Sequence, residues 1–199
     1  MALAIFPPAP SQGSEGPREV TEVTGFGRHG LNFVTSRAAP GVARRRIGSY
    51  RATVPSALYS RDILRLAASI PHHARLPHPH GSAEKRSAVC GSRVVVDVAL
   101  DGEGRVAALG QEVKACALGQ ASAALLGANA LGRTPEELAE AREALAAWLA
   151  GTSDAPGAWP GLKVLAAARP YAARHAAILL AFEAAAEAAA TAASRADAA

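Results

Sequence analysis

Apolar positions at helical spacing mark the start of the regular part of the chain. Ser60 is a good N-cap residue, and an apolar stripe follows it: Ile63, Leu64, Ala67 and Ile70. Pro71 cannot continue a helix, because it lacks a backbone N–H and its ring clashes with the preceding turn. The pattern therefore predicts a helix that begins after Ser60 and ends at Pro71.

The next periodic stretch alternates and predicts a β-hairpin. In 93–100, one side of the strand is apolar (Val94, Val96, Val98 and Leu100), while Arg93, Val95, Asp97 and Ala99 face the other side. Residues 101–104, Asp-Gly-Glu-Gly, form the turn, and 105–113 return. A bend at Gly110 is expected to begin a third short strand that ends at Cys116.

The second half of the chain is helical in pattern. Residues 117–131 read as a helix of small residues closed by Gly132. Thr134, Pro135 and Glu137 form a capping box with proline at the first helical position. This helix runs to Gly151, and after a Pro/Gly loop and a short extended or single-turn piece at 162–168, an alanine-rich helix starts near Pro170. The order predicts an α+β fold: a small antiparallel three-stranded sheet with helices packed on one face.

Charge and composition divide the chain into three parts. Residues 1–56 are rich in Pro, Gly and Ser and carry seven arginines against three glutamates, whereas 57–199 carry 14 basic and 14 acidic residues. We expect 1–56 to be a disordered basic extension, 57–190 to be the folded domain, and 191–199 to be a frayed alanine-rich tail. The arginine-rich, GC-biased composition also allows a natural start near Val54.

Several functional classes are not expected from this composition. The basic run Arg44-Arg45-Arg46 is short and lacks interleaved aromatic residues, so we expect no nucleic-acid partner. The longest apolar stretch, 172–193, contains charged residues, and the N-terminus lacks a basic signal region, so we expect no membrane association. A cytoplasmic location is the default expectation, in which cysteines are free thiols or metal ligands. No paired-carboxylate, nucleophile or phosphate-loop motif is present, and we expect a protein that is not an enzyme.

Two cysteines and a group of histidines are the candidate ligands. Cys90 and Cys116 are the only cysteines, and thiolates suit iron–sulfur clusters and zinc. They can also be ordinary buried residues. Four histidines lie in the loop 71–81 (His72, His73, His78 and His80), where they either bind a divalent ion or are simply solvated.

The phrases around the two cysteines resemble a known family. Ala88-Val89-Cys90-Gly91-Ser92 precedes a strand, Cys116 precedes Gln120-Ala121-Ser122 in a helix, and Gly132-Arg133-Thr134-Pro135-Glu136-Glu137 follows in the same order. This arrangement is similar to the IscU/NifU-N-terminal/SufU type of iron–sulfur cluster assembly scaffold. The resemblance covers about 57–190 and implies that Cys90 and Cys116 are cluster ligands.

The chain departs from that family at two of four ligand positions. Ser92 stands where the family has an aspartate, and Ala177 aligns with the third cysteine. His175 lies two residues earlier and is the candidate third ligand of a Cys90/Cys116/His175 metal site, although two helical positions rotate a side chain by about 200°. The alternative is that His175 is exposed or caps a helix.

The resemblance implies a scaffold that binds a nascent iron–sulfur cluster or metal ion for transfer. Its partners would be a cysteine desulfurase and acceptor apoproteins, and it would act as a monomer or homodimer. Two alternatives remain open: an interaction or regulatory module that kept the fold and binds no metal, or a zinc-binding sulfur-transfer partner.

Overall fold

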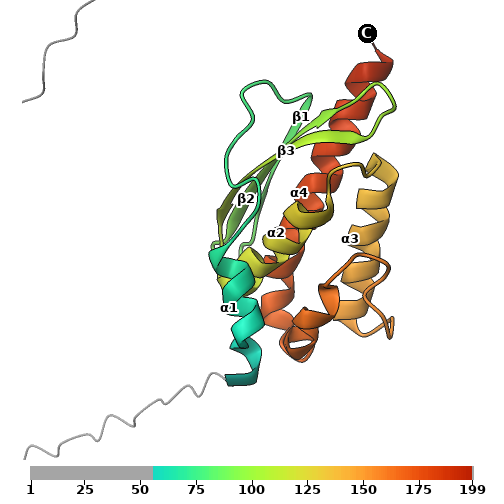
Figure 1. Ribbon diagram of the computed structural model, residues 1–199. Coiled ribbons are helices and arrows are strands. Elements are labelled where there is room, and N and C mark those ends of the chain that lie inside the picture. Colours follow the sequence, from blue (N-terminus) through green and yellow to red (C-terminus); the bar gives the residue numbers. More distant parts are fainter. Residues whose placement is uncertain (1–55, 199) are drawn as a thin grey trace, which may run out of the picture. The chain divides into compact units, whose positions relative to one another are not determined.

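The computed structural model describes residues 56–198, which form the predicted α+β fold (Figure 1). The elements in chain order are η1 (Ser56–Tyr59), α1 (Arg61–Ala68), β1 (Gly81–Arg86), β2 (Arg93–Leu100), β3 (Val106–Lys114), α2 (Ala117–Asn129), α3 (Pro135–Ala150), η2 (Leu162–Ala168) and α4 (Ala172–Asp197). The predicted extension, apart from Ser56, and the suggested start near Val54 lie outside the described residues.

The sheet has three antiparallel strands in the order β1-β2-β3. Gly110 does not begin a separate strand, because β3 continues through it to Lys114. The remaining strand of the sheet is β1, Gly81–Arg86, which the sequence pattern did not predict. β1 contains no β-branched or aromatic residue, so its own sequence does not signal a strand. Pairing with β2, from Gly81↔Val98 to Arg86↔Arg93, imposes the extended conformation.

Gly110 has a packing role instead of a bend. A Cβ at this position would lie 2.5 Å from the carbonyl oxygen of Ala74 and 2.8 Å from the amide nitrogen of Leu76. The glycine therefore lets the loop that precedes β1 lie directly on the sheet.

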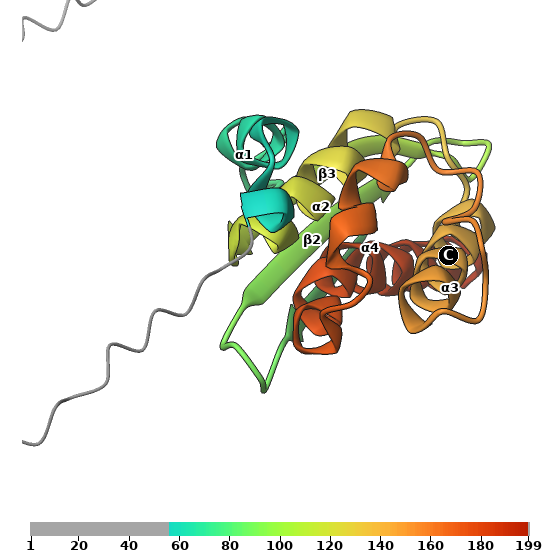
Figure 2. The same cartoon turned by 90° about the horizontal axis from the view of Figure 1, so that it is seen from below.

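The helices form one layer against one face of the sheet. α4 contacts β1 and β2, α2 contacts β3, and α1 and α3 pack on α2 and α4 respectively. Figure 2 shows α1 and α3 at opposite flanks of this layer, with α2 and α4 between them. The core is built mainly from valine, leucine and alanine.

α4 packs through very small residues. A Cβ on Gly81 would overlap the backbone of Ala188 and lie 2.7 Å from the amide nitrogen of Ala192, so strand and helix meet backbone to backbone. The tail predicted to fray from 191 is helical to Asp197, because Ala192 is 1% exposed in this contact. α4 is long and apolar enough to cross a membrane, but 56% of its apolar window is buried inside the protein, as in a core helix.

The opposite face of the sheet is partly covered by the loop between α1 and β1. Asp97, on β2, is fully buried there. Its carboxylate accepts hydrogen bonds from Arg75 Nε (2.5 Å), Arg75 Nη2 (2.9 Å) and the Leu76 amide (3.0 Å). Val95 on the same face is 3% exposed. The loop therefore provides a second, polar contact with the sheet that the sequence pattern does not signal.

The predicted helix starts are confirmed, and some helix limits are corrected. Ser60 Oγ accepts from Ile63 N (3.3 Å), and Thr134 forms a reciprocal capping box with Glu137. α2 ends at Asn129 instead of Leu131. Leu64, placed in the apolar stripe of α1, is 51% exposed, because the buried side of this short helix is centred on Ile63.

Candidate functional site

The two cysteines lie at the same end of the sheet. Cys90 is in the connection between β1 and β2, and Cys116 is the N-cap of α2, two residues after β3. The strand register pairs Arg93 with Lys114, so the start of β2 and the end of β3 are adjacent. Figure 1 shows this end of the sheet beside the start of α2 and beside α1. The topology therefore brings together two phrases that are 26 residues apart in the sequence.

Cys90 is held in a tight turn by two serines. The amide of Ser87 donates to the Ser92 carbonyl, and the amide of Gly91 donates to the Ser87 carbonyl, both at 2.9 Å. Gly91 has a φ of 68°, which a residue without a Cβ adopts readily. The Cys90 thiol donates to Ser87 Oγ at 3.3 Å and lies 3.0 Å from Ser92 Oγ. Ser92, at the family's aspartate position, is 4% exposed and contacts the thiol.

The surroundings of Cys90 favour its thiolate. Its hydrogen bonds with the Ser87 and Ser92 side chains and the Ser92 backbone lower the pKa of the thiol, and the positive charge of Arg174 lowers this pKa further. Cys90 itself is exposed. Its sulfur is therefore accessible to a reagent, a metal ion or a partner.

Cys116 begins α2 with its backbone. Its carbonyl accepts the first bond of the helix, from Gln120 N at 2.9 Å. Its side chain makes no capping hydrogen bond and is half-buried. The thiol is thus free of a structural bond within the helix start.

The first turns of α4 reach the same region but add no third ligand. Ala177 is 1% exposed and packs against α2, where a Cβ on Gly119 would lie 2.9 Å from the Ala177 carbonyl oxygen. Nearby, Ser122 Oγ donates to the Ile178 carbonyl at 2.6 Å. Ala177 is therefore a core residue in the α2–α4 contact.

His175 is directed toward η2. Its Nε2 lies 3.0 Å from the Arg169 carbonyl oxygen and 3.3 Å from that of Ala168. This matches the helix-capping alternative, because the ring occupies the end of η2. Within residues 56–198, no group of three His, Cys, Asp or Glu side chains is placed to hold a metal ion. The structure therefore does not bring His175 together with Cys90 and Cys116.

Three of the loop histidines accept hydrogen bonds from backbone amides of the sheet. His80 Nδ1 accepts from the Leu100 amide at 3.0 Å, and His73 Nε2 accepts from the Val113 amide at 3.4 Å. The His72 carbonyl accepts from the Gln111 amide at 2.8 Å. These contacts cover backbone groups at strand ends and edges, so the structure gives the side chains of His73 and His80 a role in folding.

A row of alternating charges crosses the three strands on the face opposite the helices. Arg86 pairs with Glu84 (2.5 Å), Glu84 with Arg93 (2.9 Å), Arg93 with Glu112 (2.7 Å), and Glu112 with Lys114 (3.4 Å). The hydrogen bonds with Arg86 and Arg93 lower the pKa of Glu84. Sequence reasoning missed this charge row, because it depends on the register of β1, which was not predicted. The row links the three strand ends that carry the two cysteine segments.

The donor set fits half of a cluster or metal site. Two thiols are available where a tetrahedral zinc site or a cubane or rhombic cluster uses about four ligands. Cys90 is exposed and Cys116 half-buried, so an external ligand has access. The residues present are compatible with a shared site and do not form a complete one.

Solved structures with a similar fold include a NifU-like protein and a SUF-system scaffold protein. A nitrogen-fixing NifU-like protein (N-terminal) from Brucella abortus is 35% identical, with a TM-score of 0.66, and the match covers 70% of this chain and 97% of that chain. A candidate iron–sulfur cluster assembly scaffold protein for the SUF system from Fervidobacterium islandicum AW-1 is 20% identical, with a TM-score of 0.61 and coverages of 68% and 98%. No protein-family model and no curated protein sequence matches the chain.

Proposed function

Because the chain belongs to the family of NifU-like N-terminal proteins, we propose that it is an iron–sulfur cluster assembly scaffold. In this role it holds a nascent cluster or a metal ion and passes it to acceptor proteins. The observation that carries the proposal is the placement of two accessible thiols, Cys90 and Cys116, at one end of the sheet. Thiolates are the ligands that such clusters prefer.

In this role the cluster is transferred to other proteins, and an incomplete set of protein ligands favours its release. With two protein thiolates, the remaining ligands come from a small thiol such as glutathione or from a second copy of the chain. Ser92 supplies no carboxylate, and its hydroxyl supports the Cys90 sulfur instead. The lowered pKa of Cys90 increases the thiolate fraction near neutral pH, which favours metal binding.

The proposed partners follow from this role. Sulfur would be delivered by a cysteine desulfurase and the cluster would leave for acceptor apoproteins. We place the protein in the cytoplasm, as a binding protein without a reaction of its own. Neither nucleic acid nor a membrane is part of the proposal.

The test is anaerobic reconstitution of the full chain with ferrous iron, sulfide and glutathione. We expect visible absorption bands of thiolate-bound iron and protein-bound iron by metal analysis. Cys90→Ala and Cys116→Ala should each abolish both signals. Val89→Ala is the matched control, because Val89 neighbours Cys90 and is 71% exposed, so its loss leaves the thiols in place. A colourless, iron-free wild-type protein contradicts the proposal.

The same reconstitution also distinguishes a second function, that of an interaction module that kept the fold without binding metal. A protein that binds neither iron nor zinc supports this module. Stoichiometric zinc that is lost in Cys116→Ala would instead identify a zinc-binding sulfur-transfer partner.

A further inference from the structure

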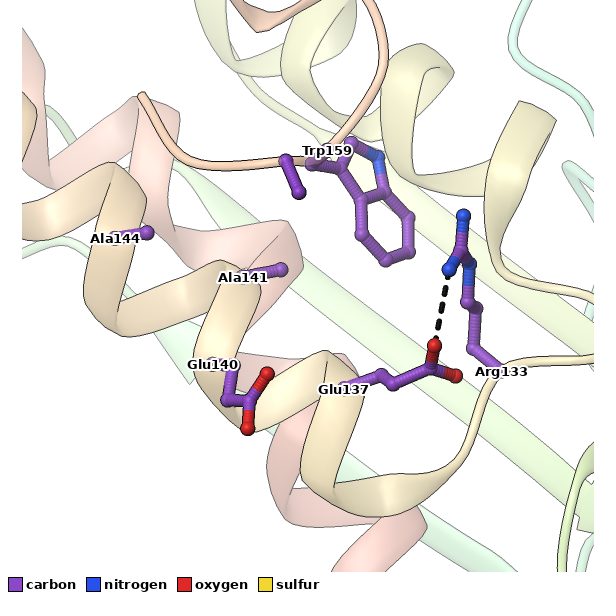
Figure 3. A pocket seen from close by; sticks show the side chains of 7 residues that line it. Arg133, Glu137, Glu140, Ala141, Ala144 and Trp159 are labelled. Atoms are coloured by element: carbon purple, nitrogen blue, oxygen red, sulfur yellow. Dashed lines mark hydrogen bonds and ion pairs between the residues drawn. The ribbon is translucent and has the colours of Figure 1, made fainter. Parts of the chain in front are cut away.

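A cavity that includes neither cysteine lies between α3 and the loop 151–161. It has a volume of about 200 Å³ and is lined by Arg133, Glu137, Glu140, Ala141, Ala144, Ala158 and Trp159. Figure 3 shows Trp159 on the loop side and Ala141 and Ala144 on the helix side. The two alanines leave space that longer side chains would fill. The cavity has room for one long side chain from outside the protein.

The aromatic wall of the cavity is fixed. Trp159 Nε1 donates to the Leu125 carbonyl at 3.1 Å, and its ring stacks edge-on against Phe182, with centroids 5.4 Å apart. The loop is also held on α3, because a Cβ on Gly157 would lie 2.6 Å from the Ala144 Cβ. The indole therefore does not need to reorganise to receive a ligand.

The protein already places one cation against this indole. The Arg133 guanidinium lies 5.5 Å from the Trp159 ring centroid and pairs with Glu137 Oε1 at 3.0 Å. Both Glu137 oxygens are used, since Oε2 accepts from the Thr134 amide at 2.9 Å. The bonds from the Thr134 amide and Arg133 lower the pKa of Glu137. The charges of Arg133 and Glu137 thus neutralise each other. The contact between Arg133 and the Trp159 ring is a cation–π interaction, which stabilises a guanidinium at this wall of the cavity.

Glu140 supplies an additional negative charge at the rim. It is exposed and, among the described residues, has no ion-pair partner. Its position one turn after Glu137 places a carboxylate beside the apolar floor of Ala141 and Ala144. The cavity as a whole therefore carries one net negative charge next to an aromatic and aliphatic surface.

We propose that this cavity is a docking site for a lysine or arginine side chain of a partner protein. The aliphatic stem would lie on Ala141, Ala144 and the indole edge, and the cationic head would pair with Glu140. Long basic side chains combine an apolar stem with a charged head, which matches this order of surfaces. This docking site is independent of the proposed cluster-binding role.

The test is a titration of the ¹⁵N-labelled full chain with three capped peptides, acetyl-Gly-X-Gly-amide, where X is arginine, lysine or citrulline. The reporters are the two indole N–H resonances. We expect the Trp159 resonance to shift saturably with the arginine or lysine peptide while Trp148, outside the cavity, does not move. Citrulline keeps the shape of arginine without its charge and should bind at least fivefold more weakly.

Two matched variants separate a specific site from general electrostatics. Glu140→Gln should weaken the cationic peptide at least fivefold. Glu136→Gln removes the same charge from an exposed position of the same helix outside the cavity lining, and should change binding less than twofold. The proposal is overturned by the absence of a saturable Trp159 shift, by equal effects of the two variants, or by citrulline binding as tightly as arginine.

Discussion

Removing the arginine that faces the buried Asp97 should destabilise the protein and reverse the pH dependence of this site. In Arg75→Met the aliphatic stem is kept, while the side chain of Asp97, 0% exposed, loses both guanidinium bonds. Breaking a buried ion pair from one side costs about 3–5 kcal/mol. We expect about 3 kcal/mol at pH 7, at the low end, because the Arg75 side chain is 46% exposed and the lost interaction is partly screened.

The sign of the pH effect follows from the causes of the Asp97 pKa. Burial alone raises this pKa, but the bonds from Arg75, Ser82 and the Leu76 amide outweigh burial and lower it. In the wild type the contribution of Asp97 is therefore present above the unfolded pKa, about 3.9, and is lost as pH falls through the lower folded value. In Arg75→Met burial dominates, the folded pKa is raised, and stability returns as pH falls toward 3.9.

The assay is urea unfolding followed by circular dichroism, at several pH values from 7 to 4. The difference between wild type and Arg75→Met should shrink from about 3 kcal/mol at pH 7 to about 1 kcal/mol at pH 4, because protonation removes the unpaired buried charge. Arg65→Met is the control: its ion pair with Asp62 is 3.9 Å long and exposed, and exposed pairs contribute about 0–1 kcal/mol. A difference that stays constant with pH would refute the reasoning.

Three further predictions concern the thiol of Cys90 and the stability of the helices. In a Cys116→Ser background, the alkylation rate of Cys90 with iodoacetamide should reach half its maximum at a pH below the pKa of free cysteine, about 8.5. Ser87→Ala should raise this midpoint pH. A midpoint unaffected by Ser87→Ala argues against the contribution of the serine. Gly119→Ala should lower the melting temperature, because the new Cβ would lie 2.8 Å from the Ala115 Cβ and 2.9 Å from the Ala177 carbonyl oxygen. The cost of this crowding, about 1–3 kcal/mol, exceeds the helix-propensity gain of about 1 kcal/mol. An increase in melting temperature would show that α4 moves aside at little cost. Thr134→Ala should cost about 1 kcal/mol in chemical unfolding through loss of the capping box, and a neutral result would mean that α3 is held by packing alone.

Local chemistry explains which parts of the fold the sequence could predict. The capping box at Thr134, the Gly151 helix end and the valine-rich β2 each depend on neighbouring residues, and all three are confirmed. β1 has a sequence without strand preference, and its conformation comes from pairing with β2. The roles of His73 and His80 likewise come from loop–sheet contacts that no local pattern encodes.

The candidate site was predictable to the extent that it rests on chain order. The phrases around Cys90 and Cys116 lie at strand and helix ends, and the antiparallel register then brings those ends together. The direction of the His175 ring depends on where η2 ends, and the burial of Ala177 depends on the closeness of α2 to α4. Such contacts between distant segments are not encoded by residue spacing, so the sequence alone did not show that His175 Nε2 lies against carbonyl oxygens at the end of η2.

The backbone contact between Gly81 and α4 lies at the opposite end of β1 from the Cys90 segment. Strand and helix meet there without intervening side chains, so a larger residue on either side has no direction in which to relax. This constraint acts at the start of β1, whereas Cys90 follows the end of the same strand. Residues around Cys90 can therefore change without loosening this packing, and the fold does not depend on the chemistry at that end of the sheet.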